Sequence, residues 1–107
     1  MSVFSRIFKK APSTQMRAVL HIISADSSLE SVVMPHIDLN EESIDWKPIF
    51  KLPLSTGHMT AALVAYSMWT DRVRTKTNFL ATATSMDQTL QQACLEAIAM
   101  RWGLLKA

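Results

Sequence analysis

The stretch that decides the fold is GHMTAALVAYSMWTDRVR, residues 57–74. Its centre, AALVAYSMW at residues 61–69, is apolar except for Ser67. A helix that is apolar on several sides is typical of one buried on more than one side. We therefore predict a central buried helix here, which the rest of the chain covers.

The composition of the chain favours one domain made of helices. The 107 residues suffice for a single domain, and 49% of them are hydrophobic while 19% are charged, so general disorder is not expected. Only two glycines occur, and tight hairpin turns depend on glycine. We predict a compact all-α fold of four to six helices, and the alternative is an α+β fold with one or two short strands.

The first helix of this domain is predicted from apolar spacing. Ser13 or Thr14 can cap a helix that runs to about Ala25. The i, i+3, i+4, i+7 template is filled by Met16, Val19, Leu20 and Ile23. In the α+β alternative, AVLHIIS at 18–24 and NFLATAT at 78–84 are the strand candidates, because both contain branched residues.

Capping signals predict the remaining helices. Ser27 and Glu30 have capping-box spacing, and Pro35 is expected to end the short helix that they begin. Ser85 and Gln88 have the same spacing ahead of the last helix, which runs to about Trp102.

The segment between Pro35 and the central helix is harder to interpret. We expect a connector at 36–39, then a turn that Asn40 caps and that holds Glu41 and Glu42. Asp45 is a second possible cap. One or two short helices are expected, with one apolar face formed by Trp46, Ile49 and Phe50.

Residues 1–12 are predicted to form a basic amphipathic arm ahead of a helical domain at 13–107. Phe4, Ile7 and Phe8 share one helical face. Arg6, Lys9 and Lys10 lie off that face. Such an arm can pack on its own domain or dock in a partner's groove, and it suggests membrane contact only weakly.

Charge is segregated along the chain. Residues 18–46 contain six acids and no Lys or Arg, whereas the residues before and after carry net positive charge and bring the total to +2. These blocks can neutralise one another within the fold. They can also form a surface with separate acidic and basic regions, which orients a partner or supports self-association.

Chemical motifs are scarce. His21, His36 and His58 do not have metal-ligand spacing, and no glycine-rich phosphate loop is present. We therefore expect no metal and no cofactor. Cys94 lies among alanine and leucine, which favours a small core residue over a nucleophile. A small enzyme that uses Cys94 is accordingly the least favoured function.

The pattern as a whole favours a non-catalytic protein-interaction, regulatory or assembly module, with homodimerisation through helices as one form of assembly. The candidate partner-binding residues are large aromatic side chains, namely Phe4, Phe8, Trp46, Trp69 and Trp102. The alternative is nucleic-acid binding at the basic end of the central helix, where the candidate phosphate contacts are Arg72, Arg74 and Lys76.

The compartment is predicted from what the sequence lacks. Cys94 is the single cysteine, so no intramolecular disulfide can form. We find neither a secretory signal pattern nor an apolar run of about 18 residues. These features predict a cytoplasmic protein.

Overall fold

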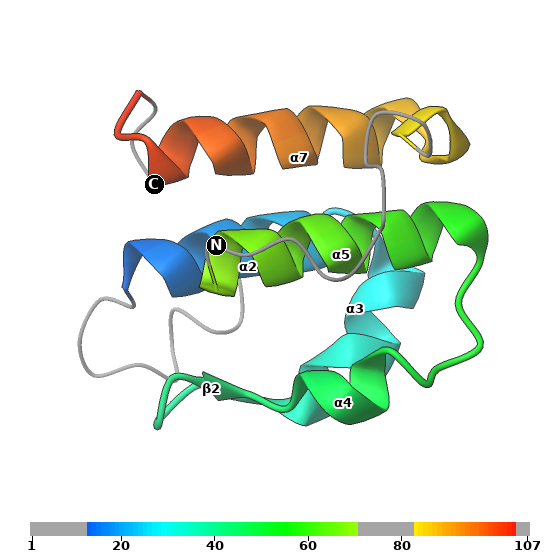
Figure 1. Ribbon diagram of the computed structural model, residues 1–107, viewed down its shortest axis with the longest axis horizontal. Coiled ribbons are helices and arrows are strands. Elements are labelled where there is room, and N and C mark those ends of the chain that lie inside the picture. Colours follow the sequence, from blue (N-terminus) through cyan, green and yellow to red (C-terminus); the bar gives the residue numbers. More distant parts are fainter. Residues whose placement is uncertain (1–12, 71–82, 105–107) are drawn as a thin grey trace.

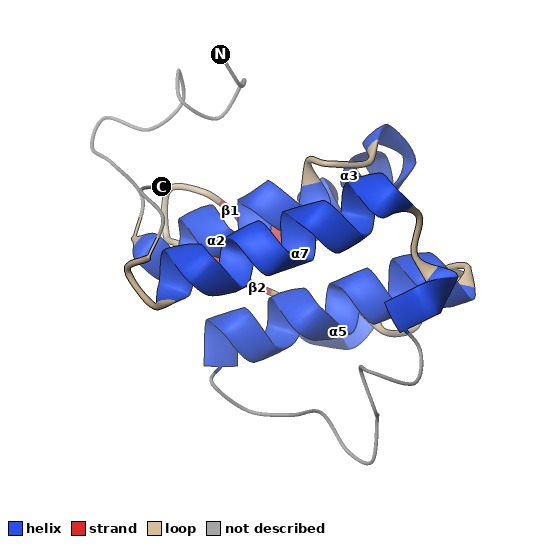
Figure 2. Ribbon diagram, turned by 90° about the horizontal axis from the view of Figure 1, so that it is seen from above, coloured by secondary structure: helices blue, strands red, loops and turns tan. Residues whose placement is uncertain are grey.

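Three long helices lie side by side at the centre of the computed structural model, which describes residues 13–70 and 83–104 (Figure 1). They are α2 (Thr14–Ile23), α5 (Thr56–Thr70) and α7 (Gln88–Arg101). α7 lies over the line between α2 and α5, as the view from above shows (Figure 2). The colours of Figure 1 show that α5 and α7 run in one direction and α2 in the other.

Shorter elements cover the side of α2 and α5 that faces away from α7 (Figure 1). They are α3 (Ser27–Val33), the 3-10 turn η1 (Met34–His36), the strands β1 (Ile37–Asp38) and β2 (Ser43–Ile44), and α4 (Trp46–Ile49). A second 3-10 turn, η2 (Ala83–Ser85), leads into α7. The predicted helical fold is confirmed: 70% of the described residues are helical, when the two 3-10 turns are counted with the five α-helices, and one small two-stranded sheet is present.

The predicted central helix is confirmed from Thr56 to Thr70. Its buried residues lie all round the helix, namely Gly57, Thr60, Ala61, Ala62, Leu63, Val64, Ala65 and Ser67. The serine and threonine hydroxyls do not stay unpaired, because Thr60 donates to the Thr56 carbonyl and Ser67 to the Leu63 carbonyl. The two buried hydroxyl groups are therefore hydrogen-bonded within α5 itself, to carbonyls one turn earlier.

α2 shares the centre of the molecule with α5. Its side chains Met16, Ala18, Val19, Leu20, Ile22 and Ile23 have no exposed surface. Ser13 caps this helix, because its hydroxyl accepts the Met16 N–H at 3.1 Å. The helix ends at Ile23 rather than at Ala25, and the segment AVLHIIS lies mostly within it, so the prediction of a strand there is wrong.

Aspartates cap two helices for which serines were predicted. Asp26 accepts the Leu29 N–H at 3.0 Å at the start of α3, and Asp87 accepts the Leu90 N–H at 2.9 Å at the start of α7. The capping boxes at Ser27 and Ser85 are therefore wrong. A carboxylate accepts the backbone N–H as a charged group and also interacts favourably with the positive end of the helix dipole, whereas a serine hydroxyl is a neutral and weaker acceptor.

The turn predicted around Asn40 is present, but it is the loop of a β-hairpin, and Asp38 rather than Asn40 caps it. β1 and β2 pair in antiparallel register, with Ile37 opposite Ile44. The loop is held by Asp38, whose Oδ1 accepts the N–H groups of Asn40 and Glu41, each at 3.0 Å. The backbone of Glu42 has a φ of 50°. Glu42 thus adopts the left-handed backbone that glycine commonly supplies in a hairpin, and the hydrogen bonds to Asp38 hold the loop in place.

Gly57 permits a close approach between α5 and η2. A Cβ atom at this position would lie 2.5 Å from the carbonyl oxygen of Ser85. Backbone atoms therefore occupy the space that any other side chain would enter. This contact fixes the start of α7 against the start of α5.

Among the described residues, no helix is long and apolar enough to cross a membrane. The arm at 1–12, the cationic end of the central helix after Thr70 and most of the strand candidate at 78–84 lie outside the described residues.

Candidate interaction surface

α7 has two apolar faces. One is buried against α2 and α5 and consists of Leu90, Ala93, Cys94, Ala97 and Met100. The other, here called the α7 seam, consists of Gln88, Gln91, Leu95, Ile98 and Trp102. Leu95 is 65% exposed and Trp102 is 73% exposed. Large apolar side chains thus remain in solvent on a helix whose other face already forms part of the core.

The α7 seam has the spacing of a helix-pairing surface. Gln88, Leu95 and Trp102 are seven residues apart, and Gln91 and Ile98 occupy the intervening positions. A seven-residue repeat with alternating steps of three and four keeps side chains on one line along a helix. That line is the geometry with which helices pair in coiled coils.

An apolar groove runs beside the seam, between α5 and α7. Its volume is about 440 Å³. α5 contributes Val64, Ser67 and Met68, and the other side is formed by Ala83, Met86, Gln91, Cys94, Leu95 and Ile98. Methionine side chains are flexible and adapt to different apolar partners. The groove could therefore accept apolar side chains from a helix that lies along the seam.

The charged side chains of α7 are engaged within the chain. Glu96 Oε1 lies 2.7 Å from His21 Nε2, and Glu96 Oε2 accepts the Gln92 side-chain amide at 3.1 Å. These hydrogen bonds lower the pKa of Glu96, and the bond to His21 has the larger effect. Arg101 donates its Nε–H to the Met68 carbonyl at the end of α5, at 2.9 Å. The α7 seam itself contains no charged residue.

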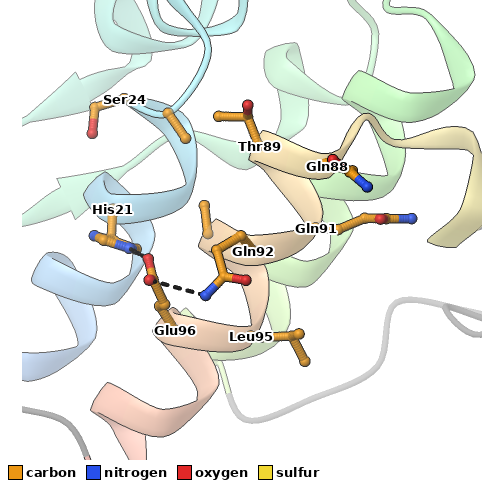
Figure 3. Close-up of a pocket in the computed structure, with 10 residues that line it drawn as sticks. His21, Ser24, Gln88, Thr89, Gln91, Gln92, Leu95 and Glu96 are labelled. Carbon is orange, nitrogen blue, oxygen red and sulfur yellow. Dashed lines mark hydrogen bonds and ion pairs between the residues drawn. The ribbon is translucent and has the colours of Figure 1, made fainter.

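A polar pocket lies between α2 and α7, and the seam residues Gln88, Gln91 and Leu95 are part of its lining (Figure 3). Its volume is about 820 Å³, and its lining includes the His21–Glu96 pair, Ser24, Thr89 and the amides of Gln88, Gln91 and Gln92. Leu95 projects from α7 away from His21 in Figure 3. An imidazole bonded to a carboxylate can act in acid–base chemistry. Among the described residues, however, Glu96 is the only side chain that His21 contacts by a hydrogen bond.

The described residues contain no group of three or more His, Cys, Asp or Glu side chains that could hold a metal ion. His58 is paired with Asp26 at 3.1 Å. Cys94 is buried, and its Sγ lies 3.8 Å from Met86 Sδ. Burial raises the pKa of Cys94 to about 12, so the thiol is protonated near neutral pH, whereas a nucleophile must be a thiolate.

The three tryptophans predicted to bind a partner lie in different environments. Trp46 is half-buried and packs on Phe50 and Tyr66, with ring centroids 5.8 Å and 5.3 Å away. Trp69 is also half-buried and packs against the core. Trp102 alone among them is mostly exposed. Trp102 is thus the one predicted partner-binding residue, among those described, that lies on the seam. The other predicted site residues lie outside the described residues, namely Phe4, Phe8, Arg72, Arg74 and Lys76.

The sign of the charge differs between the described residues and the rest of the chain. The described residues include four Lys or Arg side chains and eight Asp or Glu side chains, a formal net charge of −4, whereas the whole chain carries +2. The acidic block of the sequence places Asp38, Glu41, Glu42 and Asp45 in and beside the hairpin. Among the described residues, these four acids outnumber the two lysines of the neighbouring segment, Lys47 and Lys51.

Sequence reasoning missed four of the five seam residues as site residues, namely Gln88, Gln91, Leu95 and Ile98. The available signal was the seven-residue spacing from Gln88 to Trp102, which the stronger core pattern of the same helix obscures.

Comparisons with known protein families, with curated proteins and with solved structures find no match to this chain.

Proposed function

We propose that this chain is a protein-interaction module whose docking surface consists of the α7 seam and the groove between α5 and α7. One observation carries the proposal: Leu95 and Trp102 are 65% and 73% exposed at seven-residue spacing on a helix that already buries another face. Small monomers seldom leave apolar side chains aligned in this way, and such surfaces mark interaction sites.

The composition of the surface supports this proposal. Interface centres are depleted of charge and enriched in tryptophan and methionine. The seam carries Trp102 and no charge, and the groove contains Met68 and Met86. A helix lying in a groove is recognised through side chains at spacings of three, four and seven residues, and the seam follows the same spacing.

Within the described part of the chain, no observation specifically supports nucleic-acid binding or enzyme activity, the two alternative functions. The described residues carry a net charge of −4, which disfavours contact with phosphates, and the candidate residues Arg72, Arg74 and Lys76 lie outside them. For enzyme activity, the Cys94 thiol contacts Met86 rather than a histidine. Both alternatives stay predictions.

Site-specific photo-crosslinking tests the proposed function. A photoreactive amino acid replaces Leu95 in one variant and Thr89 in another, and both are expressed in the cells that naturally make the chain. Thr89 is an exposed residue of the same helix that belongs neither to the seam nor to the lining of the groove. We expect protein adducts from position 95 and few from position 89. Equal adduct yields, or none from position 95, would overturn the proposal.

A further inference from the structure

We propose that the basic arm at residues 1–12 docks on the acidic hairpin of the same chain, in a groove beside β1 and β2. The acidic hairpin is defined as residues 37–45, which include Asp38, Glu41, Glu42 and Asp45. The inference does not rest on the proposed function, because the groove and the α7 seam share no residue.

The described part of the chain begins on the acidic hairpin. The backbone N–H of Ser13 donates to Glu42 Oε1 at 2.9 Å. One turn into α2, Met16 lies in the same buried cluster as Leu39 of the hairpin. The arm is therefore joined to the fold at a point that is fixed on the hairpin.

This attachment favours docking on the hairpin over docking elsewhere. Exposed ion pairs are individually weak, but a short linker gives a tethered segment an effective concentration of the order of mM at its site. Lys9 and Lys10 precede Ser13 by four and three residues. Even a fully extended chain carries them no more than about 13 Å from it. Several weak contacts within that distance are sufficient to hold the arm.

The groove combines apolar surface with acids that have no cationic partner. Its volume is about 510 Å³, and its lining includes Pro35, Ile37, Asp38 and Asp45 but no lysine or arginine. Among the described residues, no lysine or arginine forms an ion pair with Asp38, Glu41 or Asp45. Because like charges at short range repel one another, a cationic occupant would relieve this repulsion.

The arm has the complementary composition. It contains three cations and no acid, a formal charge of +3, whereas the described residues carry −4. Its predicted apolar face includes Phe4 and Phe8. Amphipathic segments bind grooves through their apolar side chains, while opposite charges at the rim fix the orientation. The arm and the groove thus match in both apolar surface and charge.

Photo-crosslinking within the full chain tests the proposal. A photoreactive phenylalanine analogue replaces Phe8, which keeps an aromatic side chain at that position, and the adducts are mapped by mass spectrometry. We expect adducts at residues 35–45, at the mass of a single chain. A tethered arm that is not docked also collides with the hairpin, so variants with reversed charge supply the comparison.

Reversed charges separate docking from collision. The yield of adducts should fall for Lys9→Glu with Lys10→Glu, and also for Glu41→Lys with Asp45→Lys. When all four changes are combined, the yield should rise above that of the arm variant, because opposite charges meet again. The control Glu30→Lys reverses an acid of α3 that does not line the groove, and should leave the yield unchanged. Circular dichroism should show the hairpin variant folded, since Glu41 and Asp45 are exposed.

Three outcomes would overturn the proposal. An absence of adducts at residues 35–45 would show that the arm lies elsewhere. Adducts found only at twice the mass of 12.0 kDa would show that the arm docks on a second copy. Equal yields in all folded variants, or a combined variant no better than the arm variant, would show collision without charge pairing. None of these outcomes affects the proposed function, which crosslinking from position 95 tests separately.

Discussion

Replacing Gly57 with alanine tests how closely α5 approaches η2. The added Cβ would lie 2.5 Å from the Ser85 carbonyl oxygen, 3.2 Å from the Ser85 carbonyl carbon and 3.3 Å from the Met86 Cα. The first of these distances is roughly 1 Å shorter than the optimum for such atoms. All three neighbours are backbone atoms, so no side-chain rotation can relieve the contact. The turn η2 would have to move and take Met86 with it.

Two opposing effects decide the sign of the change in stability. Alanine is favoured over glycine within a helix by about 0.5–1 kcal/mol. Forcing extra volume into a packed region costs about 1–3 kcal/mol. Because Met86 is 7% exposed and belongs to the core, moving it disturbs packing on α5 and α7 together. We therefore expect Gly57→Ala to lower the free energy of unfolding by about 1–2 kcal/mol.

Urea denaturation followed by circular dichroism measures this change, and the melting temperature should fall by at least about 4 °C. The control Thr56→Ala alters the exposed neighbouring residue and should change stability by less than about 0.5 kcal/mol. If Gly57→Ala instead stabilises the protein, the helix-propensity effect dominates, and the described contact between Gly57 and Ser85 is wrong.

Three further predictions concern caps and ionisable groups. Asp87→Ala should destabilise the protein by about 1 kcal/mol in urea unfolding because α7 loses its cap, whereas Thr89→Ala, at an exposed residue of the same helix, should be nearly neutral; equal effects would contradict the assigned cap. The Leu29 N–H, and then His58, hold the pKa of Asp26 below its ordinary value of 3.8. The stabilisation by this carboxylate is therefore present above that pH and lost as the pH falls through the lower folded-state pKa, so Asp26→Asn should weaken the pH dependence of unfolding below about pH 4; an unchanged pH dependence would argue against the pair. At about pH 8, native Cys94 should react with iodoacetamide far more slowly than the urea-unfolded chain, because its thiol is buried and its pKa is about 12; equal rates would show that the thiol is accessible.

The main helices could be predicted because their patterns are local. The apolar spacing of α2 and the apolar run of α5 each lie within one element, and Ser13 caps α2 as predicted. The starts of α3 and α7 were misassigned because a serine and an aspartate lie within two residues of each other at both sites. Spacing alone cannot decide between such neighbours, since the choice depends on the backbone angles of the flanking turn.

The hairpin and the interaction surface could not be predicted in the same way. The hairpin depends on the Asp38 carboxylate, which bonds two backbone N–H groups of the loop, and no Asn-Gly or Asp-Gly pair signals the turn. For the surface, the sequence indicated Trp102 but gave Trp46 and Trp69 equal weight. Only the fold shows which aromatic side chains meet others within the chain, since exposure depends on contacts between distant elements.

The end of α7 limits how long any complex at its seam would last. Gly103 has a φ of 75°, and the N–H groups of Gly103 and Leu104 donate to the carbonyls of Met100 and Ala99, which is the hydrogen-bond pattern of a left-handed helix end. The helix therefore stops at Arg101, and the seam is only about 20 Å long. Related complexes differ in affinity mainly through their dissociation rates. A partner held along so short a line would exchange rapidly rather than over hours.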